Sequence, residues 1–256
     1  MFLADIPDTV PIVTINRLCS SGLESCAIIA SKIKSGVIDI GIGGGVESMS
    51  LYNMKDWVRE DLISKEAKNN KSAMLTLMSM GVTSENVAEK FGIGRDKQDQ
   101  MALESHLKAA KAQKDGLFKG NLPSYSDEIV PVKTKIKDKD GNETEVVCSE
   151  DDGIRGNTKI EGLGKLKTVF KTNGTTTAGN SSQISDGAAA VVLARRSTAE
   201  KMGLPILAKF VHYATKGCPP EIMGIGPAVA IPELLNKTGT SSISQVIKSK
   251  ILISGK

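Results

Sequence analysis

The sequence is poor in aromatic residues and in cysteine, and it has no long apolar run. Aromatic residues make up 4% of the 256 residues. The four cysteines form no C-x-x-C pair, which argues against a zinc site and a disulfide framework and favours a reducing compartment. No apolar stretch approaches the roughly 20 residues that a membrane-spanning helix needs. The opening M-F-L-A-D-I-P-D has no basic region, so we expect no signal peptide.

A strong excess of charge of one sign is also missing. The chain has 33 Lys and Arg against 29 Asp and Glu, a net charge of +4. This mild excess suits an anionic small ligand and falls far short of a nucleic-acid-binding protein. With 40% apolar and 24% charged residues, the composition is that of a soluble globular protein with one large or two modest domains.

The strongest local pattern lies near the N-terminus, where an apolar run leads into a cysteine and a helix signal. The β-branched run Val10–Ile15 predicts a buried strand, and a short polar turn that contains Cys19 follows. Ser21 and Glu24 have the spacing of a capping box. A helix should therefore begin within a residue or two of Cys19.

The expected helix and the strand after it complete a strand–turn–helix–strand unit. The helix ends near Gly36, and the apolar run Val37–Ile42 predicts a strand that ends at Gly43-Gly44-Gly45. Cys26 lies at a packing position of the helix, and we interpret it as a core residue. The packing face is predicted to carry Leu23, Ala27, Ala30 and Ile33, extended by Ile29.

The position of Cys19 at a helix N-terminus has two possible meanings. The unpaired N–H groups and the dipole of a helix N-terminus favour an anion such as a thiolate. The thiolate is the attacking form of cysteine, which would make Cys19 a nucleophile. The alternative is a buried cysteine that acts as a small apolar residue. Position alone leaves both open.

The rest of the chain predicts alternating helices and strands with one long polar loop. We expect helices at 83–91 and 96–113, a hairpin within 129–147, strands at 188–194 and 206–215, and a helix that begins near Pro227. The stretch 174–185 is too small and polar to build a core, so it is either disordered or functional. His106 is predicted to be an exposed helix residue, and His212 a structural strand residue.

Two motifs and the residues around them resemble a known family. N-R-L-C-S-S-G-L, followed by G-G-G-V-E-S-M-S, is similar to the nucleophile region of the thiolases, specifically 3-ketoacyl-CoA thiolases of the peroxisomal type. The resemblance runs from about Ile6 to Gly239. It implies an α/β fold of the thiolase type, with αβαβα layers. The chain would hold the N-terminal half with an inserted loop domain and only the start of the C-terminal half, truncated at both ends.

The resemblance also implies a domain organisation. Residues 1–52 would form the first part of the N-terminal core, 53–182 a loop domain that covers coenzyme A, and 183–216 the continuation of the core. Residues 217–256 would begin the C-terminal half, with a tail from about residue 240 that matches nothing expected in the family.

Four residues match functional positions of the family. The resemblance implies that Cys19 is the nucleophile that takes the acyl group as a thioester. It implies that Met80 lies along the pantetheine arm, that Arg155 meets the nucleotide end of coenzyme A and that Ser182 hydrogen-bonds a pantetheine amide. Bacterial members often have histidine where Ser79 stands. These residue types suit the ligand: methionine packs along an apolar arm, a serine hydroxyl hydrogen-bonds an amide, and a guanidinium binds phosphate.

The implied reaction is the thiolytic cleavage of 3-ketoacyl-CoA by coenzyme A to acetyl-CoA and a shortened acyl-CoA in β-oxidation. The family motifs N-E-A-F, G-H-P and a C-x-G loop, which supply a histidine, a second cysteine and an oxyanion hole, are absent from the sequence. We therefore expect the chain alone to be inactive. Two alternatives remain: a non-catalytic acyl-CoA-binding or partner-binding remnant, and a related decarboxylating condensing enzyme.

The same resemblance sets the expected partners. Coenzyme A and acyl-CoA would be substrates, with no cofactor and no metal. A homodimer is expected if the full-length fold is present, with no nucleic acid and no membrane span. The location implied is the peroxisome, while mitochondrial or cytosolic location stays open.

Overall fold

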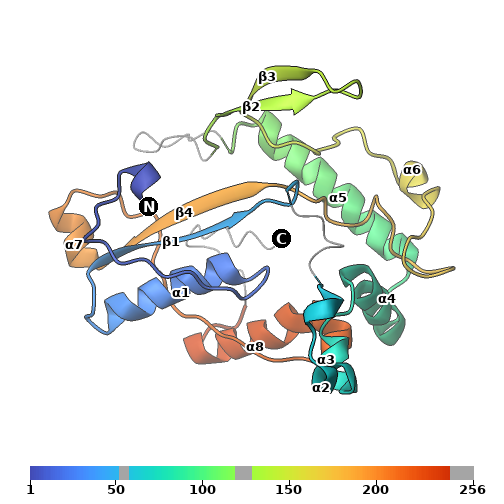
Figure 1. The fold of residues 1–256 in the computed structure, drawn as a ribbon, viewed down its shortest axis with the longest axis horizontal. Coiled ribbons are helices and arrows are strands. Elements are labelled where there is room, and N and C mark those ends of the chain that lie inside the picture. The colour runs from blue at the N-terminus through green and yellow to red at the C-terminus, as the bar shows by residue number, and fades with distance from the viewer. Residues whose placement is uncertain (52–57, 119–128, 243–256) are drawn as a thin grey trace. The chain divides into compact units, whose positions relative to one another are not determined.

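The computed structural model describes residues 1–51, 58–118 and 129–242 (Figure 1). The chain divides into two compact units. The first comprises Met1–Arg59, Ile184–Lys216 and Ala228–Lys256, and the second comprises Glu60–Gln183 and Gly217–Pro227. Each unit is built from segments that are distant in the sequence, so each is described separately.

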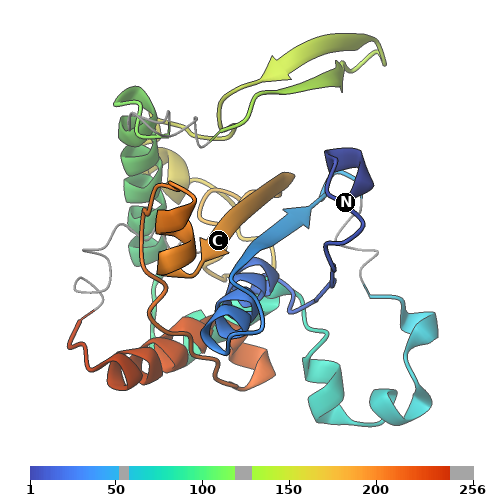
Figure 2. The same cartoon turned by 90° about the vertical axis from the view of Figure 1, so that its left-hand side faces the viewer.

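The first unit is built on a helix that packs against a two-stranded sheet (Figures 1 and 2). The helix is α1 (Ser21–Lys34), and the strands are β1 (Ile40–Glu47) and β4 (Gly187–Ala194). The strands are antiparallel, with Gly43 opposite Val191. The unit also contains the 3-10 helix η1 (Phe2–Ala4), the short helix α7 (Arg196–Lys201) and most of α8 (Gly226–Thr238).

Glycines in β1 let α1 approach the sheet closely. A Cβ atom on Gly43 would lie 2.9 Å from the backbone and Sγ of Cys26, and one on Gly41 would lie 2.9 Å from the Ile29 side chain. The helix therefore meets the strand through Cys26 and Ile29. The predicted packing face was partly wrong, because Leu23 is 54% exposed. Ala27 and Ile33 are buried as predicted.

The second unit contains two long helices and a β-hairpin. The helices are α4 (Met80–Phe91) and α5 (Arg95–Lys114), and the hairpin pairs β2 (Val132–Lys137) with β3 (Glu143–Cys148). Shorter elements are the 3-10 helices η3 (Glu60–Leu62) and η4 (Pro220–Ile225) and the helices α2 (Lys65–Lys68), α3 (Lys71–Leu75) and α6 (Ile160–Gly164). Gly92 ends α4 with a φ of 63°, the left-handed conformation that glycine adopts without steric cost.

Helices were predicted more accurately than strands. The expected helices at 83–91 and 96–113, the hairpin, the strand at 188–194 and the helix start near Pro227 are confirmed. The strand expected at 37–42 is displaced to Ile40–Glu47 and runs through the three glycines that were expected to end it.

Two predicted strands are wrong. Residues 10–15 and 206–215 are outside every strand. The side chains of Ile12 and Val13 are 61% and 67% exposed. A strand needs a hydrogen-bonded neighbour, and β1 and β4 pair only with each other among the described residues. The apolar, β-branched residues therefore indicated strands where the chain has no neighbouring strand to pair with among the described residues.

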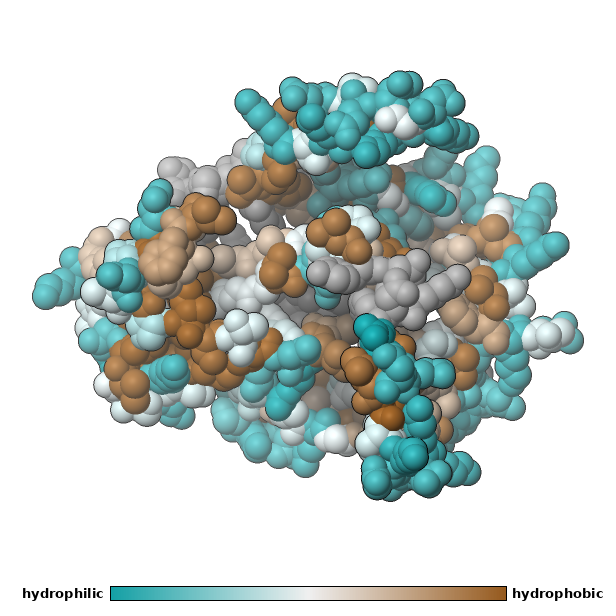
Figure 3. Space-filling model, viewed as in Figure 1, coloured by the Kyte–Doolittle hydropathy of each residue, from teal (hydrophilic) through white to brown (hydrophobic). Residues whose placement is uncertain are grey.

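The buried apolar core of the described residues is small. It consists of Ala27, Ile33, Ala88, Leu163, Ala199 and Ile222. Large apolar side chains such as Val46 and Leu18 are exposed, and apolar patches reach the surface in Figure 3. No helix of the described ranges is both long and apolar enough to span a membrane.

Candidate functional site

Cys19 lies in an exposed turn directly before α1. The helix begins at Ser21, with Ser20 as its N-cap residue, so the predicted helix start is confirmed. Cys19 is exposed and unpaired with another cysteine, which excludes the buried-cysteine interpretation. The thiol is thus available to a reagent or substrate at the N-terminus of a 14-residue helix.

Hydrogen bonds hold this turn in a strained conformation. Leu18 has a φ of 49°, a left-handed conformation that costs a non-glycine residue on the order of 1–3 kcal/mol. The Leu18 N–H donates to Asn16 Oδ1 at 2.8 Å, and Ser21 Oγ donates to the Leu18 carbonyl at 2.6 Å. Backbone contacts on both sides of Leu18 therefore fix the residue immediately before Cys19.

The predicted capping box does not form. Ser21 is the first helical residue rather than the N-cap, and its Oγ accepts the N–H of Arg17 at 2.8 Å. Glu24 instead pairs with Arg17, with 2.7 Å between Oε2 and Nη1. The spacing located the helix start correctly, but Ser21 and Glu24 both bind Arg17 instead of the helix backbone.

Arg17 connects the cysteine turn to a distant segment of the same unit. Its Nη1 donates to the Tyr213 hydroxyl at 3.0 Å and to Thr215 Oγ1 at 3.1 Å. The Tyr213 hydroxyl also donates to Glu24. Sequence reasoning missed this cluster, because Tyr213 and Thr215 lie almost 200 positions away and no local pattern links them to Arg17. His212, beside them, is exposed.

Cys26 packs, as predicted. It is partly buried and lies so close to β1 that a Cβ added to Gly43 would come within 2.9 Å of its Sγ. The other two thiols differ from each other: Cys148 is exposed at the end of β3, and Cys218 is partly buried. Cys19 and Cys148 are therefore the two exposed thiols, and only Cys19 precedes a helix.

The second unit contains the other three candidate residues. Met80 is the first residue of α4, after the N-cap Ser79, and its side chain is 43% exposed. The next residue, Gly81, lies under the ring of Phe170, where an added Cβ would come within 2.2 Å of the ring. The start of α4 is thereby fixed against the segment that leads to the polar loop.

Arg155 and Ser182 are exposed residues on two segments that contact each other. Gln183 Nε2 donates to the Asp152 carbonyl at 3.1 Å, and the Gln183 side chain covers Gly153, whose φ is 79°. The Arg155 N–H points to His106 Nδ1 at 3.3 Å. His106 is partly buried, so its predicted exposure was wrong: its ring accepts this hydrogen bond from the Arg155 backbone.

The polar loop that carries Ser182 is ordered by a buried carboxylate. Glu85 of α4 accepts the Thr176 N–H at 2.7 Å and the Thr175 N–H at 2.9 Å. Burial alone raises the pKa of the Glu85 carboxyl, but the hydrogen bonds from Thr176 and Thr175 outweigh it and hold the pKa below its ordinary value. The loop at 174–185, expected to be disordered or functional, is therefore held in place by hydrogen bonds to α4.

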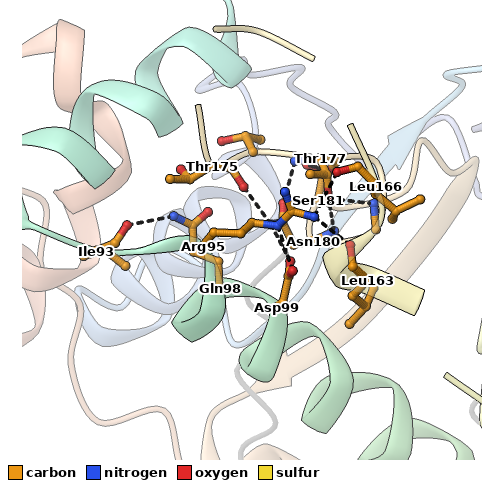
Figure 4. A network of polar contacts seen from close by, with 12 residues as sticks. Ile93, Arg95, Gln98, Asp99, Leu163, Leu166, Thr175, Thr177, Asn180 and Ser181 are labelled. Atoms are coloured by element: carbon orange, nitrogen blue, oxygen red, sulfur yellow. Dashed lines mark hydrogen bonds and ion pairs between the residues drawn. The ribbon is translucent and has the colours of Figure 1, made fainter. Parts of the chain in front are cut away.

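A second buried carboxylate, Asp99 of α5, reaches the same loop (Figure 4). Its Oδ1 accepts the side-chain amide of Asn180 at 2.9 Å, and its Oδ2 pairs with Arg95 at 2.7 Å. The Arg95 guanidinium also donates to the carbonyls of Leu163 and Leu166. Sequence reasoning missed Glu85 and Asp99, because acidic residues on amphipathic helices ordinarily face solvent. The signal available was a long polar loop whose backbone groups needed buried partners.

Within the described ranges, no group of three or more His, Cys, Asp or Glu side chains is arranged to hold a metal ion. In the first unit the reactive group is the exposed thiol of Cys19. In the second unit, the exposed guanidinium of Arg155 and hydroxyl of Ser182 lie on adjoining segments.

Comparison with known sequences places most of the chain in one family. Residues 1–197 match the family described as thiolase, N-terminal domain. The chain is 53% identical to human peroxisomal 3-ketoacyl-CoA thiolase over 238 residues, which is 93% of this chain and 54% of that protein. It is 54% identical to the peroxisomal enzyme of Yarrowia lipolytica over 237 residues, 93% of this chain and 55% of that protein. The chain therefore spans about half the length of the curated relatives it matches.

Solved structures give the same result. The dimeric peroxisomal thiolase of Saccharomyces cerevisiae matches with a TM-score of 0.82 and 46% identity, covering 93% of this chain and 57% of that one. Human mitochondrial 3-ketoacyl-CoA thiolase matches with a TM-score of 0.76 and 34% identity, covering 94% of this chain and 60% of that one. The sequence relatives named peroxisomal come from mammals, yeast and Arabidopsis, in agreement with the predicted location.

Proposed function

The chain belongs to the thiolase family, and from this premise we propose that it carries the nucleophile and part of the coenzyme A site of a 3-ketoacyl-CoA thiolase. The family membership confirms the predicted resemblance and the α/β thiolase fold class. The observation that carries the proposal is the exposed Cys19 thiol in a hydrogen-bonded turn at the N-terminus of α1.

The chemistry assigns one role to Cys19. Its thiolate attacks the C3 carbonyl carbon of a 3-ketoacyl-CoA, and the C2–C3 bond breaks. The acyl group stays on Sγ as a thioester, while C2 accepts a proton and leaves as acetyl-CoA. The thiol of a second coenzyme A then attacks the thioester, loses its proton and releases the shortened acyl-CoA, which regenerates Cys19.

The binding roles belong to the second unit. Met80 would lie along the apolar pantetheine arm, Ser182 would hydrogen-bond its amide, and Arg155 would pair with phosphate, for which a guanidinium is well suited. Two observations support these roles: all three side chains lie at least partly at the surface, and the segments of Arg155 and Ser182 touch. We further propose that residues 53–182 form the loop domain that covers the coenzyme.

The proposal includes coenzyme A as a substrate rather than a cofactor and a homodimer as the assembly of the whole protein. One solved relative is a dimeric thiolase, which supports the second point. For the 256-residue chain alone we expect slow acylation of Cys19 and no turnover. The histidine and second cysteine that the family uses for proton transfer belong to motifs absent from these residues.

The test is mass spectrometry of the chain after incubation with acetoacetyl-CoA. We expect one acetyl thioester, mapped to the peptide that contains Cys19 and absent from Cys19→Ser. A Cys148→Ser variant is the matched control, since it removes the other exposed thiol and should leave the adduct intact. An adduct shared equally among cysteines would contradict the nucleophile role. Binding of coenzyme A without any adduct would instead favour a non-catalytic acyl-CoA-binding protein.

A further inference from the structure

The loop that carries Ser182 is held by two acidic side chains from two different helices. Glu85 of α4 and Asp99 of α5 are 4% and 2% exposed. A buried carboxylate is costly unless hydrogen bonds or a cation compensate it. Glu85 accepts hydrogen bonds from Thr175 and Thr176, whereas Asp99 contacts Arg95 and Asn180. Both carboxylates thus depend on the loop for partners.

Asn180 connects the two ends of this loop. Its Nδ2 donates to Asp99 Oδ1 at 2.9 Å and to the Thr175 carbonyl at 2.9 Å. Its Oδ1 accepts the Thr177 N–H at 2.8 Å. The Thr177 hydroxyl oxygen in turn accepts the Gly179 N–H at 3.2 Å, and Thr177 is completely buried. One side chain therefore fixes a closed turn that ends two residues before Ser182.

The two carboxylate oxygens of Asp99 bind different residues. Oδ2 pairs with Arg95, and Oδ1 remains for Asn180. Arg95 itself is anchored by the Leu163 and Leu166 carbonyls at 2.6 and 3.1 Å. The carboxylate that holds Asn180 is therefore held in turn from its other side.

We propose that Asn180, fixed by Asp99, is a positioning residue of the coenzyme A site. It holds the loop in its binding conformation before the ligand arrives. The inference rests on the proposed role of Ser182 in binding pantetheine. A loop that is already ordered avoids the loss of conformational entropy that binding would otherwise cost. Ser182 touches the ligand in this scheme, whereas Asn180 acts only through the loop.

The decisive variant is Asn180→Asp. It keeps the size of the side chain but replaces the donor by a carboxylate that faces Asp99. Two other charged groups lie around this position. Arg95 of α5 pairs with Asp99 Oδ2, and Glu85 of α4 accepts the Thr175 N–H. At neutral pH the two carboxylates repel each other, and the loop opens. At acid pH one proton shared by the pair restores a donor.

Two measurements test the proposal on the 256-residue chain. Hydrogen exchange followed by mass spectrometry reports the protection of peptides that span 175–182 without ligand. Calorimetry reports the affinity for pantetheine and for coenzyme A. We expect Asn180→Asp to lose protection and at least about tenfold in affinity at pH 7.5, with partial return of both at acid pH. A residue that only stabilises the fold would lower protection throughout the unit rather than in 175–182 alone.

Matched variants separate the loop from the rest of the unit. Gln98→Ala changes the residue beside Asp99. The Gln98 side chain donates to the Ile93 carbonyl at 3.1 Å and to no loop residue among those described, so loop protection and affinity should stay as in the unaltered chain. If Asn180→Asp fails to fold, the exchanged pair Asp99→Asn with Asn180→Asp is used. It removes the repulsion and restores one hydrogen bond between the two positions, and it should recover part of the protection at neutral pH.

The outcomes distinguish the inference from the proposed function. Unchanged protection and affinity in Asn180→Asp would overturn the positioning role, as would a loss without return at low pH. If the unaltered chain binds neither ligand, the proposed binding role of Ser182 is overturned and the inference about the site falls with it. In that case loop exchange still shows whether Asn180 orders the loop for another purpose.

Discussion

Cys26 of α1 lies directly against Gly43 of β1, at a distance that leaves no room for a side chain on the strand. A Cβ at position 43 would come within 2.9 Å of the Cys26 N, Cα and Sγ atoms. Real Cβ contacts are longer, so the helix or the strand would have to move. The contact sets how closely α1, and with it the Cys19 turn, approaches the sheet.

Gly43→Ala should therefore destabilise the first unit. Overpacking of a tight contact costs typically about 1–3 kcal/mol, and here backbone atoms form part of the obstacle. Chemical denaturation would measure the loss in the free energy of unfolding. Gly187→Ala is the matched control, because Gly187 lies in the partner strand with nothing within 4 Å of an added Cβ. Equal stability of the two variants would show that the helix has room to shift.

Cys19 should be alkylated fastest of the four thiols at neutral pH. It is exposed and lies directly before α1, and the positive end of the helix dipole at that N-terminus attracts anionic groups. Cys148 is also exposed but ends a strand, so it controls for exposure alone. Iodoacetamide labelling at increasing times, followed by peptide mapping, gives the order. Labelling of Cys148 ahead of Cys19 would mean that the turn does not activate the thiol.

Glu85 should make the stability of the second unit depend on pH in a defined window. Its pKa is lowered in the folded chain, relative to about 4.3 in an unfolded one. Its stabilising contribution is therefore complete above about pH 4.3 and is lost as the pH falls through the folded-state pKa. Glu85→Gln should be less stable at pH 7, and the difference from the unaltered chain should shrink as the pH falls through this window.

Urea denaturation of both proteins between pH 7 and pH 3.5 provides the measurement. Other carboxyls with lowered pKa values, Asp138 and Asp186 among them, are exposed and present in both proteins, so their contributions cancel in the comparison. A stability difference that stays constant across this range would argue that Glu85 is not held as a carboxylate.

The sequence predicted the local elements of this fold well and its long-range contacts poorly. Helices α4 and α5 followed from periodicity and from Gly92, because helix hydrogen bonds form within the segment. The strands expected at 10–15 and 206–215 failed, since strand pairing depends on residues far away in the sequence. The Val37–Ile42 strand was displaced for a related reason: glycines interpreted as a strand end allow α1 to approach.

The candidate site shows the same division. The turn into α1 and the exposure of Cys19 agree with local spacing and with the family motif. The Arg17–Tyr213 contact and the burial of Glu85 and Asp99 could not be predicted, because each joins segments more than 75 positions apart. Family resemblance supplied candidate residues, but it gave no account of the carboxylates that hold the Ser182 loop.

Arg155 should matter for the phosphates of coenzyme A and not for its pantetheine arm. The side chain is exposed, while its N–H and the preceding chain are tied to His106 and Gln183, so Arg155→Ala should leave the backbone in place. Loss of a charge-assisted contact, worth about 1.5–3 kcal/mol, should weaken coenzyme A binding by about tenfold or more. Pantetheine, which has no phosphate, should bind as before.

Calorimetry with both ligands distinguishes this role from a general effect on the site. Arg196→Ala is the control, since it removes an exposed guanidinium that pairs with Glu200 of the same short helix at 3.8 Å. It also lowers the net charge by the same amount, so any long-range attraction of the anionic ligand changes equally. Parallel losses for pantetheine and coenzyme A in Arg155→Ala would place the arginine along the arm. A loss confined to coenzyme A, and absent from Arg196→Ala, would place it at the phosphates.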